Sequence, residues 1–210
     1  MKVLLVNGSP HKSGCTYTAL TEVANTLKEE NIETELFWVG AKPLSGCIAC
    51  KSCAKTGQCV FHDTVNDFLA MTEGADGFIF GTPVHYAAAS GAMTSFMDRL
   101  FYADLQAGKN SFYLKPAAAV VSARRAGTTA TFDQINKYFT LQEMPVISSQ
   151  YWNMVHGASP EEVAEDLEGL QTMRTLARNM AFFLKCKEAG IKAGIPLPKQ
   201  EPRVFTNFVR

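Results

Sequence analysis

The chain has 210 residues, of which 47% are hydrophobic, and its formal net charge is +0. These values suit one domain with a full core, and the balanced charge gives no electrostatic grip on nucleic acid or on an anionic membrane. The longest apolar runs are far shorter than the roughly 20 residues of a transmembrane helix, and the first residues do not form a signal peptide. We therefore expect a cytoplasmic protein that acts on a small molecule, without a nucleic-acid or membrane partner.

The first predicted element is a strand at 2–6, an apolar run that stops at the turn Gly8-Ser9-Pro10. Apolar residues at helical spacing follow between Ala19 and Leu27, and Thr16 or Thr18 is expected to cap that helix. The remaining elements alternate in the same way. In chain order they are a strand at 33–39, a short helix around 65–69, a strand at 77–80, a helix at 92–102, a strand at 117–121, a helix at 131–141, a strand at 145–148, and a helix that begins at Ser159-Pro160 and runs to about Lys187.

Strands that alternate with helices predict right-handed βαβ units and thus an α/β fold. We expect a doubly wound, five-stranded parallel sheet with helices on both faces. The predicted domain covers residues 1–189, and residues 190–210 form an extended C-terminal tail, because Pro196, Pro198 and Pro202 exclude a regular helix. Ligands of such sheets bind outside the carboxyl ends of the strands, so the loops that follow the strands are the candidate functional segments.

The loop after the first strand, residues 8–16, combines two glycines, three hydroxyl side chains and a lysine just before a helix. Free backbone N–H groups and the helix dipole favour an anion at such a place, so we interpret the loop as a phosphate site. It matches neither the G-x-x-x-x-G-K-[ST] loop of nucleotide triphosphatases nor the dinucleotide pattern G-x-G-x-x-G. An ordinary strand–turn–helix junction is the alternative interpretation.

Two further loops are expected at the same edge of the sheet. Residues 82–86, Thr-Pro-Val-His-Tyr, offer an apolar and aromatic surface on which a planar ring could lie. Residues 122–128 add hydroxyl groups, a flexible glycine and two cations, Arg124 and Arg125. The two arginines are equally well explained as ordinary surface residues of a loop.

Four of the six cysteines lie in residues 46–59 with the spacing C-x₂-C-x₂-C-x₅-C, at Cys47, Cys50, Cys53 and Cys59. In a reducing cytosol such a group indicates metal or redox chemistry rather than a structural disulfide framework. The two-residue spacers allow successive thiolates to converge on one [4Fe–4S] cluster. Zinc ranks second, because structural zinc more often uses two cysteine pairs a dozen or more residues apart. Free thiols or a disulfide without any metal remain open.

Together these segments resemble the flavodoxin-like NAD(P)H-dependent FMN reductases, and especially their iron–sulfur flavoprotein branch. Residues 8–16 are similar to the family's G-S-P-R-x-x-G-N-T loop and residues 82–86 to its P-V-Y-Y loop, while Asp98-Arg99 resembles the end of the helix that follows. His11 stands where the family usually has arginine, and Cys15 where it usually has asparagine. The resemblance implies an FMN site made of Ser9, His11, Ser13, Cys15 and Thr16 at the phosphate, Pro83, Val84, His85 and Tyr86 beside the isoalloxazine, and Ser122, Arg124, Arg125 and Gly127 at its other edge.

The function implied is hydride transfer from NAD(P)H to FMN, followed by electron delivery to a small acceptor such as a quinone, an azo or nitro compound, or free flavin. A [4Fe–4S] cluster on the four cysteines would divide the flavin's electron pair into single electrons. The alternative is an electron carrier that exchanges electrons with a ferredoxin-like protein. No catalytic acid or base is identified. The resemblance also implies a homodimer or homotetramer, in which the C-terminal tail crosses between subunits.

Overall fold

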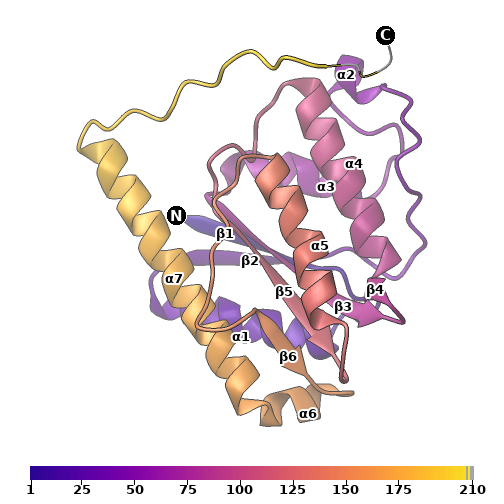
Figure 1. Ribbon diagram of the computed structural model, residues 1–210, viewed down its shortest axis with the longest axis vertical. Coiled ribbons are helices and arrows are strands. Elements are labelled where there is room, and N and C mark those ends of the chain that lie inside the picture. The colour runs from indigo at the N-terminus through magenta and orange to yellow at the C-terminus, as the bar shows by residue number, and fades with distance from the viewer. Residues whose placement is uncertain (207, 209–210) are drawn as a thin grey trace.

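The structure, a computed structural model, describes residues 1–206 and 208 (Figure 1). Strands and helices alternate along the chain as the periodicities predict. The strands are β1 (Lys2–Asn7), β2 (Glu33–Trp38), β3 (Gly77–His85), β4 (Ala88–Ala89), β5 (Ala117–Ala123) and β6 (Met154–His156). The helices are α1 (Cys15–Glu29), α2 (Cys53–Thr56), α3 (Thr64–Met71), the 3₁₀ turn η1 (Thr72–Gly74), α4 (Gly91–Ala107), α5 (Thr128–Leu141), α6 (Pro160–Glu165) and α7 (Leu167–Lys192).

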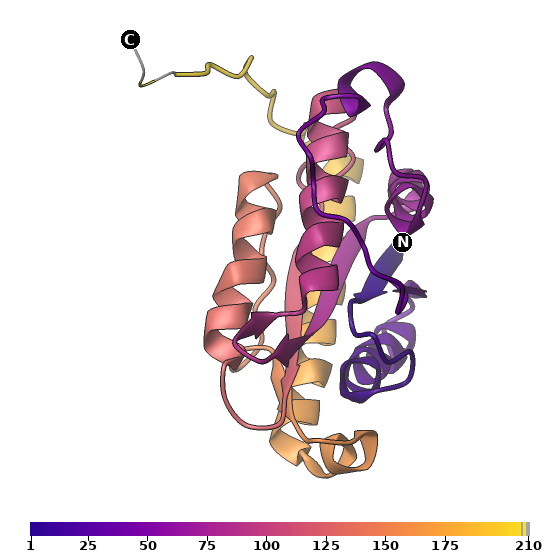
Figure 2. The same cartoon turned by 90° about the vertical axis from the view of Figure 1, so that its right-hand side faces the viewer.

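Five parallel strands form the sheet in the order β2-β1-β3-β5-β6. The short β4 pairs antiparallel with the end of β3 and turns it into a hairpin. Both faces of the sheet are covered, as shown in Figure 2, where α4 stands in front of the sheet and α7 behind it. The predicted five-stranded parallel sheet with helices on both faces is therefore confirmed.

The core consists of two layers, one on each face of the sheet. Leu4 and Val6 of β1 point into a layer shared with α3, α4 and α5. Their neighbours Val3 and Leu5 point into the other layer, which α1 and α7 complete. Because a parallel sheet is buried on both sides, its strands are continuous apolar runs rather than alternating ones. This is why the apolar runs in the sequence locate the central strands correctly.

The fifth strand was predicted at 145–148 and is instead β6 at 154–156. Residues around Val146 form only one isolated parallel bridge, to Ala117 at the beginning of β5. The chain then leaves the sheet and returns where the N–H of Val121 donates to the carbonyl of Asn153 at 2.9 Å. The prediction was wrong because both segments contain short apolar runs, and only pairing with β5 decides which one continues as a strand.

The beginnings of two helices also differ from the prediction. Neither Thr16 nor Thr18 caps α1, whose N-cap is Gly14, without a side-chain cap among the described residues. The Ser159 cap is present, because its hydroxyl accepts a hydrogen bond from the N–H of Glu162. The helix nevertheless ends at Glu165, since the carboxylate of Asp166 accepts from the N–H of Gly169 and begins α7. A second N-cap, the carboxylate of Asp166, thus divides one predicted helix into two.

The long helix α7 continues to Lys192, so the predicted domain boundary at 189 lies inside it. In the described part of the chain beyond Ala193, no helix or strand is present, and the segment runs back across the molecule (Figure 1). The hydroxyl of Tyr113 donates to the carbonyl of Pro198 at 3.1 Å, and Arg203 lies 3.9 Å from Glu143. None of the described helices has both the length and the apolar character needed to cross a membrane.

Ser90 joins three elements at the ligand edge of the sheet. Its side-chain oxygen accepts from the N–H of Met93 at 3.2 Å and caps α4. The same hydroxyl donates to the carbonyl of Gly8 at 2.8 Å, and the Ser90 N–H donates to the hydroxyl of Thr82 at 3.2 Å. A hydroxyl can donate and accept at once, so one buried serine ties α4 to the first loop and to β3.

Ser90→Ala should lower the free energy of unfolding by about 1–3 kcal/mol, because it removes a helix cap and leaves the buried Gly8 carbonyl without its donor. Urea denaturation followed by circular dichroism measures this. Thr94→Ala is the matched control, since the Thr94 hydroxyl only donates to the Gly91 carbonyl at the exposed start of the same helix. Equal losses for the two variants would contradict the role given to Ser90.

Candidate functional site

The first loop is shaped by Asn7, a fully buried residue at the end of β1. Its side-chain oxygen accepts from the N–H of Ser9 at 3.0 Å, and its side-chain amide donates to the carbonyls of Lys12 at 3.2 Å and His11 at 3.4 Å. Three loop positions are thus held by one side chain. The sequence interpretation did not single out Asn7, although a polar residue that ends an apolar strand was the available signal.

The loop leads into the N-terminus of α1, which lies directly on the sheet. The packing depends on Gly81 in β3, where a Cβ atom would approach Leu20 Cδ1 to 2.8 Å and Thr16 Cγ2 to 2.9 Å. Because no side chain caps α1 in the described structure, its first-turn N–H groups remain for a ligand. A phosphate or another anion fits such a helix end.

Beside this helix end lies an open cleft of about 280 Å³, close to the lower limit of about 300 Å³ for ligand pockets. Nine of the thirteen predicted cofactor residues line it. They are Ser9, His11, Cys15, Thr16, Pro83, Val84, His85, Ser122 and Arg124. Loops that follow β1, β3 and β5 therefore meet at one place, as expected for the carboxyl edge of a parallel sheet.

Four predicted residues are not among those that line the cleft. Ser13 and Arg125 are exposed to solvent. Tyr86 lies at the turn of the β3–β4 hairpin with φ of 56° and is fully exposed. Gly127 instead serves as the N-cap of α5 with φ of 92°, a left-handed conformation that favours glycine, and a Cβ there would approach Val84 Cγ1 to 2.9 Å.

Three residues of the cleft were absent from the predicted set: Ala123, Gly157 and Ala158. Ala123 lies between two predicted residues, and the other two follow β6. The sequence interpretation placed Gly157 at the ligand edge of the sheet but did not include it among the cofactor residues.

Hydroxyl groups and a neutral thiol line the cleft together with His11, His85 and Arg124. The side-chain oxygens of Thr16 and Ser122 are 2.8 Å apart and join α1 to β5. The thiol of Cys15 donates to the carbonyl of Gly157 at 3.6 Å, and burial raises the pKa of this thiol. Cys15 therefore stays protonated at neutral pH and adds no negative charge beside a bound anion.

Trp38, at the end of β2, supports the loop from outside the cleft and was also missed. Its indole N–H donates to the carbonyl of Ser9 at 2.8 Å, and the ammonium of Lys12 lies 5.9 Å from the centre of its ring. A half-buried aromatic residue with a satisfied indole N–H is an ordinary way to fix a loop. Only the pairing of β2 with β1 brings Trp38 to this place.

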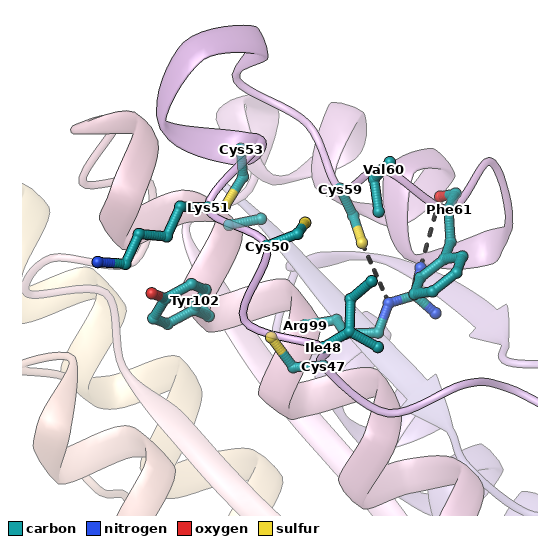
Figure 3. Close-up of a pocket in the computed structure, with 11 residues that line it drawn as sticks. Cys47, Ile48, Cys50, Lys51, Cys53, Cys59, Val60, Phe61, Arg99 and Tyr102 are labelled. Atoms are coloured by element: carbon teal, nitrogen blue, oxygen red, sulfur yellow. Dashed lines mark hydrogen bonds between the residues drawn. The ribbon is translucent and has the colours of Figure 1, made fainter.

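The four clustered cysteines line a second, smaller hollow between residues 47–61 and α4 (Figure 3). Cys53 is buried at the beginning of α2, and Cys59 is half-buried. Cys47 and Cys50 are exposed in a stretch without helix or strand. The hollow of about 20 Å³ is large enough for about one water molecule.

The sulfur atoms do not converge as the spacing predicted. Among the described residues, no three histidine, cysteine or acidic side chains form a group that could hold a metal ion, and all six cysteines are free thiols. Cys47 and Cys50 are exposed to solvent, so burial in the core does not hold their thiols beside those of Cys53 and Cys59. The set of four thiols around one hollow still fits the ligand requirement of an iron–sulfur cluster, provided that this segment closes.

Comparison with known proteins agrees with the geometry of the cleft. The family model described as NADPH-dependent FMN reductase matches residues 1–159. An iron–sulfur flavoprotein of Methanocaldococcus jannaschii is 33% identical over 194 residues, which cover 88% of this chain and 98% of the relative.

Solved structures show the same fold at low sequence identity. RosB, in a crystal structure with bound 8-demethyl-8-formylriboflavin-5′-phosphate, has a TM-score of 0.70 and 15% identity, with 100% of this chain and 92% of that chain covered. A flavodoxin from the domain Archaea has a TM-score of 0.59 and 15% identity, with 88% and 99% covered. The sheet is therefore flavodoxin-like, and the chain belongs to the NADPH-dependent FMN reductase family and, within it, to the iron–sulfur flavoproteins.

Proposed function

We propose that this chain is an oxidoreductase that binds FMN in the cleft and passes electrons from NAD(P)H to a small acceptor such as a quinone, an azo or nitro compound, or free flavin. One observation carries the proposal: an uncapped helix N-terminus meets the ends of β3 and β5 in a single cleft. Family membership supports it. The riboflavin phosphate derivative bound to the structurally similar RosB supports it as well.

The residues of the cleft suggest how FMN would be held. The first-turn N–H groups of α1 and the hydroxyls of Ser9 and Thr16 would bind the phosphate, while Pro83 and Val84 offer an apolar surface to the ring. Bound there, FMN would supply the chemistry of hydride acceptance from NAD(P)H and of one- or two-electron transfer. The protein's own contribution is to fix the ring against β3 and β5 and to exclude water from the face that it covers.

We further propose that the four cysteines hold a [4Fe–4S] cluster. Four thiols around one hollow support this, because thiolates are the ligands of such clusters. The iron–sulfur flavoprotein relative supports it too. Cys53 and Cys59 already face the body of the protein, and the exposed segment with Cys47 and Cys50 would close over them.

The exposure of Cys47 and Cys50 favours a second candidate function. A redox centre at the surface can exchange electrons with a protein, so the chain could act as a carrier for a ferredoxin-like partner without using nicotinamide. Both candidates share the FMN cleft. They differ in the electron donor.

Anaerobic mixing with NADPH or NADH separates these candidates. A reductase should lose the flavin absorbance within seconds, because hydride transfer reduces the bound FMN. A flavin that is reduced by dithionite or by reduced ferredoxin but by neither nicotinamide would contradict the reductase and support the carrier. Purified protein without flavin, unable to take up added FMN, would overturn both.

Thr16→Val should weaken FMN binding by about tenfold, because it removes a buried hydroxyl from the phosphate site while it preserves the shape of the side chain. Quenching of FMN fluorescence on titration into apoprotein measures the Kd. Thr18→Val is the matched control, since that hydroxyl donates to the Gly14 carbonyl of its own helix. If both variants bind as tightly as the wild type, the phosphate does not lie at Thr16.

Cys53→Ser should remove most of the iron from anaerobically purified protein, which we expect to carry about four irons per chain. Metal analysis for iron, sulfide and zinc makes the measurement. Cys186→Ser is the control, because Cys186 is exposed on α7, away from the hollow. Zinc without sulfide in the wild type would replace the cluster by a zinc site, and loss of iron in both variants would argue against specific ligation by Cys53.

A further inference from the structure

Arg99 on α4 has the largest fully buried side chain of the described residues. A guanidinium has five N–H donors, and here each has an acceptor. Nε donates to Cys59 Sγ at 3.2 Å, and the two terminal nitrogens donate to Asp63 Oδ1 and Oδ2, both at 2.8 Å. The remaining two donors bind the carbonyls of Ser45 at 3.3 Å and Phe61 at 3.4 Å.

These acceptors lie on both sides of the cysteine-rich segment. Ser45 precedes Cys47, and Cys59 and Phe61 lie at the other end. A single side chain from α4 therefore connects the two ends of the segment. The Phe61 ring also lies against the guanidinium, with 4.8 Å between the ring centre and the guanidinium carbon.

Cys59 is held from a second direction by Asn66 of α3. The side-chain oxygen of Asn66 accepts from the Cys59 N–H at 2.8 Å, and its amide donates to the Cys59 carbonyl at 2.9 Å. Cys59 thus has a fixed backbone and a fixed donor on its sulfur. Among the described hydrogen bonds of the four cysteines, that from Arg99 to Cys59 is the one in which a side chain donates to the sulfur, so Cys59 is the anchor of the four.

The guanidinium remains charged although it is buried. Arginine keeps its proton in proteins, and the carboxylate of Asp63, 2.8 Å away, compensates the buried charge. Asp63 binds the terminal nitrogens in a bidentate pair. The third nitrogen, Nε, therefore remains free to donate to Cys59 Sγ. A structural ion pair needs only the carboxylate and does not explain the contact with Sγ.

We propose that Arg99 is the positioning residue of the cysteine site: it joins the two ends of the segment and directs an N–H group at Cys59 Sγ, so that a centre bound there has a higher reduction potential. The effect on the reduction potential rests on the proposed cluster. Hydrogen bonds to the sulfur ligands and nearby positive charge stabilise the reduced, more negative form of such a centre.

The first experiment measures the joining of the segment in full-length protein as purified, with flavin and iron quantified. Limited trypsin digestion reports cleavage after Lys55, which is exposed within the segment. Arg99→Gln should speed this cleavage about tenfold or more, because the segment opens when the buried guanidinium is lost. Arg99→Lys should give an intermediate rate, since an ammonium cannot bridge both ends. Lys28→Gln, which removes an exposed charge from α1 on the other face of the sheet, should behave as the wild type.

The second experiment measures the midpoint potential of the iron centre by anaerobic titration with electron paramagnetic resonance. Arg99→Gln should shift it to a more negative value, Arg99→Lys should shift it less, and Lys28→Gln should leave it unchanged. An unchanged potential in Arg99→Gln, or an unchanged cleavage rate, overturns the proposal. If Arg99→Gln does not fold, Arg99→Lys decides. Faster cleavage together with a more negative potential supports both parts, unchanged cleavage refutes the joining, and an unchanged potential refutes the effect on the potential.

The iron content of the wild-type protein separates a failure of this proposal from a failure of the proposed cluster. If it binds no iron even after reconstitution, the cluster fails and with it the effect on potential. The cleavage rates then decide whether Arg99 positions the free thiols. Faster cleavage in Arg99→Gln supports that role, and equal rates overturn it.

Discussion

The backbone contact between Gly8 and Gly81 is the constraint on which the ligand edge depends. The N–H of Gly8 donates to the carbonyl of Gly81 at 2.8 Å and joins the loop after β1 to β3. The missing Cβ of Gly81 lets α1 lie on the sheet, and the Gly8 carbonyl accepts from Ser90 at the start of α4. A side chain at either glycine would separate these elements. The cleft therefore exists because two strands and two helices can approach closely at one point.

Helix α4 connects this cleft with the cysteine site. It begins at Ser90, which is tied to the first loop, and carries Arg99 about 14 Å further along its axis. The two sites are thus fixed relative to each other by one rigid element, although the cysteine segment itself has little regular structure.

The cleft and the cysteine site differ in how completely hydrogen bonds within the protein already hold their residues in place. Asn7, Ser90 and Trp38 satisfy the loop groups around the cleft before any ligand binds. In the cysteine site, Cys59 is equally well held, whereas Cys47 and Cys50 are not. Where packing fixes the backbone, side chains are in place. Where it does not, a bound ligand would have to supply the energy that orders the segment.

The sequence by itself determined the fold class, the central strands and the edge at which the cleft lies. Apolar periodicity reports burial, and right-handed connections bring the carboxyl ends of parallel strands together. It also determined the four cysteines that line one hollow, because their spacing places them in one short segment. Only the tertiary structure decided that β6 rather than 145–148 completes the sheet, that Asp166 begins a second helix, and that Tyr86 is exposed and does not line the cleft. Arg99 meets Ser45 across 54 positions of the chain, and no local pattern encodes such a contact, since it depends on how distant segments pack.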